Sequence, residues 1–266
     1  MKLSEIYALA DEFAPKRLSD EYCARYNAYD NSGILVDTGA DIRGVLFSLD
    51  LSFGAIREAK AAGFNLIITH HPAIYGKIGC ICKDDYLGAK LIECIQNGIS
   101  VIAMHLNLDC AVGGTDESLM QAVQIAAGGE IEKEEMLMHP LSEGGYGRVY
   151  RIKPCSLASL KAGLERELST SRILVYGDSE RVIKRAASFC GAGADDTAIG
   201  FAVENADVVI SADFKHHVIA RALEEGLMVI ALTHYASENY GFKKYYEKMR
   251  RRLDIPCVYY MDSDLL

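Results

Sequence analysis

Short apolar runs alternate with amphipathic segments along the chain, and this alternation limits the folds that the sequence can adopt. The runs are rich in Val, Ile and Leu, as buried strands are, and most of the intervening segments have a helical period and end at glycine. The expected strands cover 44–50, 65–71, 172–177, 185–190, 207–213, 227–234 and 256–260, and another opens at 99. The expected helices cover 52–63, 87–98, 156–168, 197–205, 216–226 and 237–251, and another begins near 115.

Buried strands separated by helices form βαβ units, so the sequence predicts an α/β protein with largely parallel or mixed sheets. Residues 130–155 lack this alternation of apolar runs and amphipathic segments, so we expect a looser region there with an edge strand.

The two halves of the chain resemble each other. In each half a strand ends in a polar cluster, a helix ending in glycine follows, and a second strand ends in His-x-x-x-acid. These last elements are His105 with Asp109 and His234 with Glu238, and the offset is the same for both members, 234 − 105 = 129 and 238 − 109 = 129. The sequence therefore predicts two intertwined, internally duplicated α/β lobes with mixed sheets, 1–127 and 128–266. The C-terminal helix and strand are expected to pack back on the first lobe.

Composition excludes some classes of function. The chain has 266 residues, of which 50% are hydrophobic, and a formal net charge of -9. Because it has no basic face, binding to nucleic acid or to an anionic membrane is not expected. No apolar run approaches the ~20 residues that span a membrane. The N-terminal stretch MKLSEIYALADEFAPK indicates an amphipathic helix, not a signal peptide, so a cytoplasmic location is expected.

The eight cysteines include no CxxC pair, and in a cytoplasmic chain they are expected to be reduced thiols. Cys80 and Cys82 form a CxC that offers an alternative, a site for a soft metal. No second Cys/His pair has the spacing of a structural zinc site, which weighs against that alternative.

Histidines collect where the expected strands end. Six of the seven histidines lie there, namely His70, His71, His105, His216, His217 and His234. Sites in α/β sheets form at the carboxyl ends of strands, and imidazole with carboxylate is the ligand set of divalent transition metals. The sequence therefore predicts a metal site at these strand ends, between the lobes.

The arrangement of the expected ligands leaves two possibilities open. Adjacent residues of an extended segment point to opposite sides, so His70 and His71 can serve two metals, or one metal if a turn at Pro72 re-aims one ring. A carboxylate can bridge two metals about 3.5–4 Å apart. His216 and His217 stand at a helix start, where a role near substrate or on the helix surface is favoured over metal ligation.

Four blocks of the sequence resemble the signature blocks of the NIF-three-like family, also called GTP cyclohydrolase I type 2 homologues. They are ITHHP (68–72), HLNLD (105–109) followed by GG, SADFKHH (211–217) and THYASE (233–238). NSGILV (31–36), FSLD (47–50) and GRVYRI (147–152) also fit, so the resemblance spans about residues 27–250. The chain departs from the family pattern at Ile34, at Ala212 and in the CGAGA turn (190–194), all of which concern the outer pocket.

The resemblance implies a dinuclear metal centre. Its ligands would be His70, His71, Asp109, His234 and Glu238, with Glu238 as the bridging carboxylate and Asp109 as the other candidate. It would hold two divalent ions of zinc, iron, manganese, cobalt or nickel. The resemblance also implies a toroidal homohexamer.

Two functions are compatible with such a centre. The first is a hydrolase of the GTP cyclohydrolase type, in which an activated water attacks C8 of a purine nucleotide and opens the imidazole ring. His105 and His217 are then the candidates for proton transfer. The second is a non-catalytic protein for metal trafficking or regulation. Gly191–Gly193 could present backbone N–H groups to a phosphate or form a plain strand-to-helix turn. The absence of a GxxxxGK[ST] loop argues against ordinary nucleoside triphosphate hydrolysis.

Overall fold

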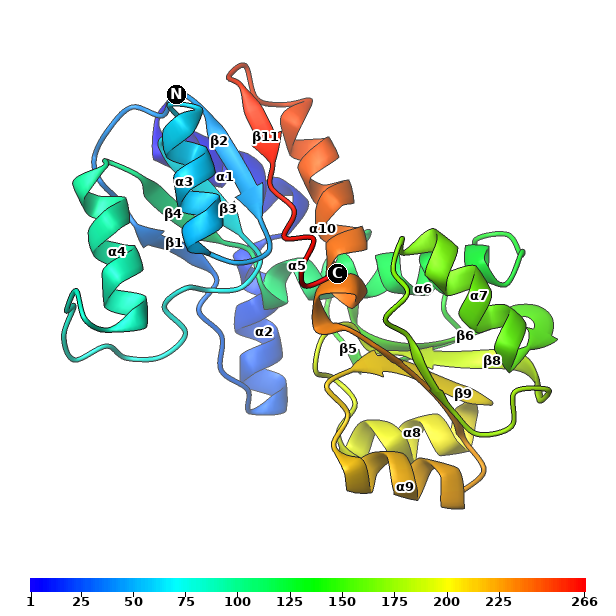
Figure 1. The fold of residues 1–266 in the computed structure, drawn as a ribbon. Coiled ribbons are helices and arrows are strands. Elements are labelled where there is room, and N and C mark those ends of the chain that lie inside the picture. The colour runs from blue at the N-terminus through cyan, green and yellow to red at the C-terminus, as the bar shows by residue number, and fades with distance from the viewer. The chain divides into compact units, whose positions relative to one another are not determined.

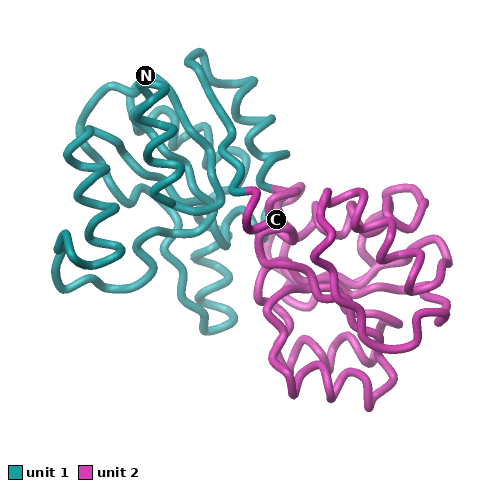
Figure 2. Tube along the Cα trace, in the orientation of Figure 1, with its two compact units in different colours: residues 1–111, 242–262 teal, residues 112–241, 263–266 magenta.

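A computed structural model describes all residues, 1–266, and they form two compact units. Unit 1 comprises residues 1–111 and 242–262, and unit 2 comprises residues 112–241 and 263–266 (Figure 2). Each unit contains one mixed sheet with helices on its faces (Figure 1). The α/β class and the two mixed sheets confirm the prediction from sequence. No helix is both long enough and apolar enough to cross a membrane.

Unit 1 has a five-stranded sheet in the order β1-β4-β3-β2-β11. Its strands are β1 (Gly33–Val36), β2 (Val45–Ser48), β3 (Leu66–Thr69), β4 (Ser100–Ala103) and β11 (Cys257–Tyr259). β11, β2, β3 and β4 are parallel, and β1 pairs antiparallel with β4 at the edge. Every residue of β2, β3 and β4 is buried, as expected for parallel strands covered on both faces.

The helices of unit 1 cover this sheet. They are α1 (Leu3–Phe13), α2 (Lys16–Tyr26), α3 (Phe53–Ala61), α4 (Tyr86–Gln96) and the short α5 (Leu106–Cys110). Leu46 packs with Ile56 of α3 and Cys94 of α4, whereas its neighbour Phe47 packs against Phe242 of α10 on the opposite face. The alternation of strand side chains therefore builds one apolar layer on each side of the sheet.

Unit 2 has a six-stranded sheet in the order β5-β6-β8-β9-β10-β7. Its strands are β5 (Met136–Pro140), β6 (Gly145–Ser156), β7 (Leu174–Tyr176), β8 (Val182–Ser188), β9 (Val208–Ala212) and β10 (Met228–Leu232). Its helices are α6 (Thr115–Ala126), α7 (Leu157–Glu167), α8 (Asp196–Asn205), α9 (His216–Glu224) and the start of α10 (His234–Arg250), which continues in unit 1 from Phe242. Figure 1 shows α6 and α7 on one face of the sheet and α8 and α9 on the other.

The two units repeat one topology, which confirms the internal duplication. The series β1-β2-α3-β3-α4-β4 of unit 1 corresponds to β7-β8-α8-β9-α9-β10 of unit 2. The spatial orders β1-β4-β3-β2 and β7-β10-β9-β8 agree, with three parallel strands and an antiparallel edge strand in each. The units differ beyond β2 and β8, where β11 joins parallel and β6 joins antiparallel. The ends of β3 and β4 thus have counterparts at the ends of β9 and β10.

Residues 130–155 include the expected edge strand, β5, but they are more regular than the looser region that the sequence predicted. This region contains the hairpin β5–β6, and β6 is the longest strand of the protein at 12 residues. Within β6, Gly147 has φ +73° and lies so close to the end of β8 that a Cβ would come within 2.5 Å of the ring of Phe189, which follows β8. Glycine is therefore required at this point of the strand by the positive φ and by the close approach of Phe189.

The compact units also divide the chain differently from the expected lobes 1–127 and 128–266. Helix α6 lies in unit 2 because its C-terminal turn packs on α7, where a Cβ on Gly163 would come within 2.1 Å of the Ala126 carbonyl oxygen. Residues 242–262 belong to unit 1, where β11 pairs with β2.

Candidate metal centre

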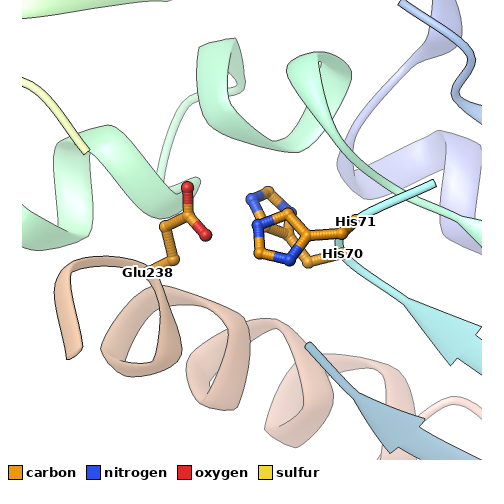
Figure 3. Close-up of side chains that lie close together, drawn as sticks. All are labelled: His70, His71 and Glu238. Atoms are coloured by element: carbon orange, nitrogen blue, oxygen red, sulfur yellow. The ribbon is translucent and has the colours of Figure 1, made fainter. Parts of the chain in front are cut away.

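The carboxyl ends of β3 and β4 bring three donor residues together within unit 1. His70 and His71 follow β3 directly, and His105 precedes the short helix that carries Asp109. Donor atoms of His70, His105 and Asp109 all lie within 4.8 Å of one another. The His71 ring is 5.0 Å from the His70 ring. Figure 3 shows the two adjacent imidazoles at the end of β3, and it also shows the carboxylate of Glu238 on α10.

The protonation of His70 is fixed by a backbone carbonyl. His70 Nδ1 lies 2.7 Å from the Met104 carbonyl oxygen, which can only accept a hydrogen bond, so Nδ1 carries the proton in the neutral ring. The lone pair is then on Nε2, which lies 3.4 Å from Oδ1 of Asp109. Both side chains are buried, at 0% and 5% exposure. Two acceptor atoms facing each other in a buried site repel unless a proton or a metal cation lies between them. The donor set therefore fits a metal ion.

Carboxylates hold the other two histidines of unit 1 in the same way. His71 Nδ1 lies 2.8 Å from Asp50 Oδ1, and His105 Nδ1 lies 2.7 Å from Asp30 Oδ1. Burial opposes the charge of Asp30, but hydrogen bonds from His105 and from two serines hold the pKa of Asp30 well below its ordinary value. An ionised carboxylate accepts a hydrogen bond from Nδ1–H, so the lone pair of the ring is on Nε2, on the side away from the carboxylate. This arrangement is found around ligating histidines.

Unit 2 repeats the arrangement at the end of β10. His234 is the first residue of α10 and Glu238 follows one turn later, with 3.1 Å between His234 Nε2 and Glu238 Oε1. Nδ1 of His234 lies 2.5 Å from Asp213, which follows β9. Burial would lower the pKa of His234, but the two carboxylates raise it to about 9. Without a metal the imidazolium balances one of the two carboxylate charges, so a metal ion bound here has to displace a proton.

The CGAGA turn forms a wall behind Glu238. Gly191 has φ +60°, and a Cβ on it would lie 2.3 Å from Oε1 of Glu238 and 3.3 Å from Nε2 of His234. Its N–H donates to Ser237 Oγ at 2.9 Å, and its carbonyl accepts from the Ala212 N–H at 3.0 Å. Because the Gly191 amide is bound to Ser237, this turn positions the carboxylate, and the Gly191 N–H does not point to a phosphate.

A buried carboxylate anchors this turn to the hairpin. Asp116 is fully buried, accepts the N–H groups of Cys190 at 3.1 Å and Gly147 at 3.0 Å, and pairs with Arg148 Nε at 3.0 Å. Arg148 also contacts Glu134 at 3.1 Å. The network ties the start of α6, β6 and the end of β8 together. The sequence marked Arg148 only as part of the GRVYRI block and gave no sign of its role.

Comparison with known proteins identifies the family of this chain. A family model described as Duf34/NIF3 (NGG1p interacting factor 3) matches residues 1–262. The chain belongs to this family. Its relatives include a protein of Clostridium perfringens named GTP cyclohydrolase 1 type 2 homolog, which is 32% identical over 257 residues covering 96% of this chain and 93% of that protein. A Methanocaldococcus jannaschii protein of the same name is 29% identical over 97% of this chain and 98% of its own length.

Two solved structures share the fold of this chain. The Staphylococcus aureus hypothetical protein SA1388 superimposes with a TM-score of 0.83 at 22% identity, over 100% of this chain and 98% of the other. Reduced HcgD from Methanocaldococcus jannaschii gives a TM-score of 0.77 at 27% identity, over 97% of both chains.

Within this family fold, the remaining candidate residues lie apart from the donor groups. His217 Nε2 is 3.5 Å from Asp196, and both side chains are mostly exposed. The structure places His217 in no group of metal donors, and a role for it in proton transfer stays a prediction. Cys80 and Cys82 are exposed free thiols outside the donor groups, so the alternative of a soft-metal site gains no support.

The structure also adds residues that sequence reasoning missed. Asp30, Asp50 and Asp213 each hold a histidine by Nδ1. Asp50 and Asp213 follow strands, which was a usable signal. Asp30 is 75 positions away from His105, and no local pattern connects the two.

Proposed function

We propose that this protein is a metal-dependent hydrolase of the GTP cyclohydrolase type that binds two divalent ions per chain. The proposed ligands are His70, His71, Asp109, His234 and Glu238. The proposal is carried by the hydrogen-bond partners that orient the histidines. A carbonyl or carboxylate oxygen lies against Nδ1 of each of His70, His71 and His234, so each Nε2 is oriented as a donor to a metal.

The carboxylates supply the negative charge that the ions require. The side chains of Asp109 and Glu238 are 5% and 4% exposed, and the burial of two carboxylates costs free energy of desolvation that cations offset. Glu238 is the proposed bridge because its carboxylate is held between His234 and the Gly191 turn. When bound, a divalent pair supplies Lewis acidity and lowers the pKa of a coordinated water.

His105 is the proposed proton acceptor. Asp30 accepts a hydrogen bond from Nδ1–H of His105, so the lone pair of the ring is on Nε2. The ionised carboxylate of Asp30 stabilises the imidazolium that forms when Nε2 takes up a proton. His105 is 21% exposed, which leaves a route for the proton to solvent.

A purine nucleotide is the proposed substrate, and a toroidal homohexamer is the proposed assembly. The substrate class is supported by the names of relatives, which are called GTP cyclohydrolase 1 type 2 homologs. The hexamer follows from the family resemblance alone, and sedimentation analysis of the purified protein tests it.

Turnover of a nucleotide panel by metal-loaded protein tests the proposal, with chelator-stripped protein as the control. His105→Ala is expected to keep its metal and to lose about 10²–10⁴-fold in turnover, the usual contribution of a positioned acid or base. His216→Ala is the matched control, since His216 is an exposed histidine at the start of α9. His217→Ala in the same assay tests the second candidate. Equal turnover by wild type and His105→Ala would remove His105 from the mechanism.

One observation favours metal trafficking as a second candidate function. The side chain of His234, a proposed ligand in unit 2, is 35% exposed, whereas His70 is fully buried. A metal held by a partly exposed donor can pass to an acceptor. If no metal form turns over any nucleotide while the loaded protein delivers metal to an apo-acceptor faster than free release, the hydrolase proposal is abandoned in favour of this one.

A further inference from the structure

Two tyrosines of unit 1 expose a pair of aromatic rings. Tyr29 and Tyr75 are 54% and 52% exposed. Their ring centroids are 5.3 Å apart and the ring planes meet at 81°, an edge-to-face arrangement. By contrast, Tyr22 is only 8% exposed. Exposed aromatic surface that is held in a defined geometry commonly marks a binding site.

Hydrogen bonds hold the pair in place. The Tyr75 hydroxyl donates to the Tyr29 carbonyl oxygen at 3.0 Å, and the Asn31 side-chain amide donates to the Ile74 carbonyl oxygen at 2.5 Å. These two bonds join the segment after α2 to the loop after β3. The rings are therefore preorganised, and a ligand that stacks on them loses little entropy in ordering them.

The pair borders the histidine cluster of unit 1. The Tyr75 ring is 6.3 Å from the His105 ring at 88°, and Tyr75 lies four residues after His71 in the same loop. Tyr29 is followed directly by Asp30, which holds His105. The same two segments thus carry the aromatic pair and position the proposed proton acceptor.

We propose that Tyr29 and Tyr75 form a stacking platform for a planar heteroaromatic ring, the nucleobase of the substrate. This inference rests on the proposed function and deepens it, because it assigns the recognition of the base to residues that hold no metal. A base stacked here lies beside His105. Stacking uses the π-face that every base has, so the platform binds guanosine and adenosine to a similar extent. Choice between the two bases is left to other contacts.

Binding of nucleosides to chelator-stripped protein tests the platform without any need for turnover. Guanosine, adenosine and ribose 5-phosphate are titrated and followed by ligand-observed NMR. Both nucleosides are expected to bind and ribose 5-phosphate is not. Tyr75→Leu is expected to weaken both nucleosides by roughly 5- to 150-fold, and Tyr75→Phe by much less, because the ring is kept.

Tyr86→Leu is the matched control. Tyr86 is 70% exposed, and the ammonium group of Lys90 on the same helix lies over its ring at 3.8 Å from the centroid. Because Tyr86 is not part of the platform, its replacement should leave nucleoside binding unchanged. Equal affinities for wild type and Tyr75→Leu, or no nucleoside binding to wild type, overturn the platform. A change of oligomer size in Tyr75→Leu with unchanged nucleoside binding overturns it too, and assigns the rings to contact with a second copy. Bases that bind without being turned over support the platform and count against the proposed hydrolase.

Discussion

Replacing Gly191 by alanine should weaken metal binding by displacing a carboxylate. The new Cβ would lie 2.3 Å from Oε1 of Glu238, while ordinary contacts begin at 3.4 Å, so the two groups must separate by 3.4 − 2.3 = 1.1 Å. Metal–ligand distances tolerate only about 0.2 Å. The buried Glu238 side chain has little room to compensate, since the wall it meets is backbone held by Ser237.

The expected effect has two parts, a loss of stability from backbone strain and a loss of metal affinity from the displaced carboxylate. The left-handed backbone at φ +60° costs an alanine about 1 kcal/mol, which lowers Tm by ~2–4 °C in a chain of this length. The displaced carboxylate is expected to weaken metal affinity by a further 10- to 100-fold, the usual cost of disturbing the support of a ligand. Gly226 supplies the control, because it has φ +82° and nothing within 4 Å of its Cβ position.

The assay is competitive titration of Zn²⁺ or Mn²⁺ against a chelator, with thermal unfolding of the metal-free proteins alongside. Gly226→Ala should lower Tm by the same amount as Gly191→Ala and should bind metal with wild-type affinity. The reasoning fails if Gly191→Ala binds metal with wild-type affinity, or if Gly226→Ala weakens binding equally.

Three further predictions concern the buried charges. Arg148→Met removes the cation that pairs with the buried carboxylate of Asp116 and should lower the free energy of unfolding by about 3–5 kcal/mol, measured with urea; a loss below 1 kcal/mol would contradict it. Glu238→Gln keeps the size but not the charge and should release at least one of two metals by elemental analysis; retention of both would move the bridge to Asp109. In metal-free protein the raised pKa of His234 stabilises the fold fully below pH 6.5, and this stabilisation is lost as the pH rises through about 9. The unfolding free energies of wild type and His234→Gln should therefore converge at high pH, and a constant difference would refute the assignment.

Local patterns in the sequence were enough to predict the class of fold and the residue types of the candidate site. Buried parallel strands read as continuous apolar runs, so β3 and β4 were recognisable from local composition. The 129-residue offset between His105 and His234 predicted the duplication that the repeated strand order confirms. His70 and His71 could be assigned to the carboxyl end of a strand because that position follows from the run before them. Such signals are local, and periodicity and residue type are enough to show them.

The side chains that support the donors became visible only in the folded chain. Asp30 reaches His105 across 75 positions, and Asp116 reaches Cys190 across 74. Residues 130–155 were expected to be looser because local propensity cannot show that Phe189 leaves no room for a Cβ on Gly147. Gly191 likewise looked like an ordinary turn residue until Glu238 was placed against it. These contacts depend on strand register and on packing between distant segments, which no window of sequence contains.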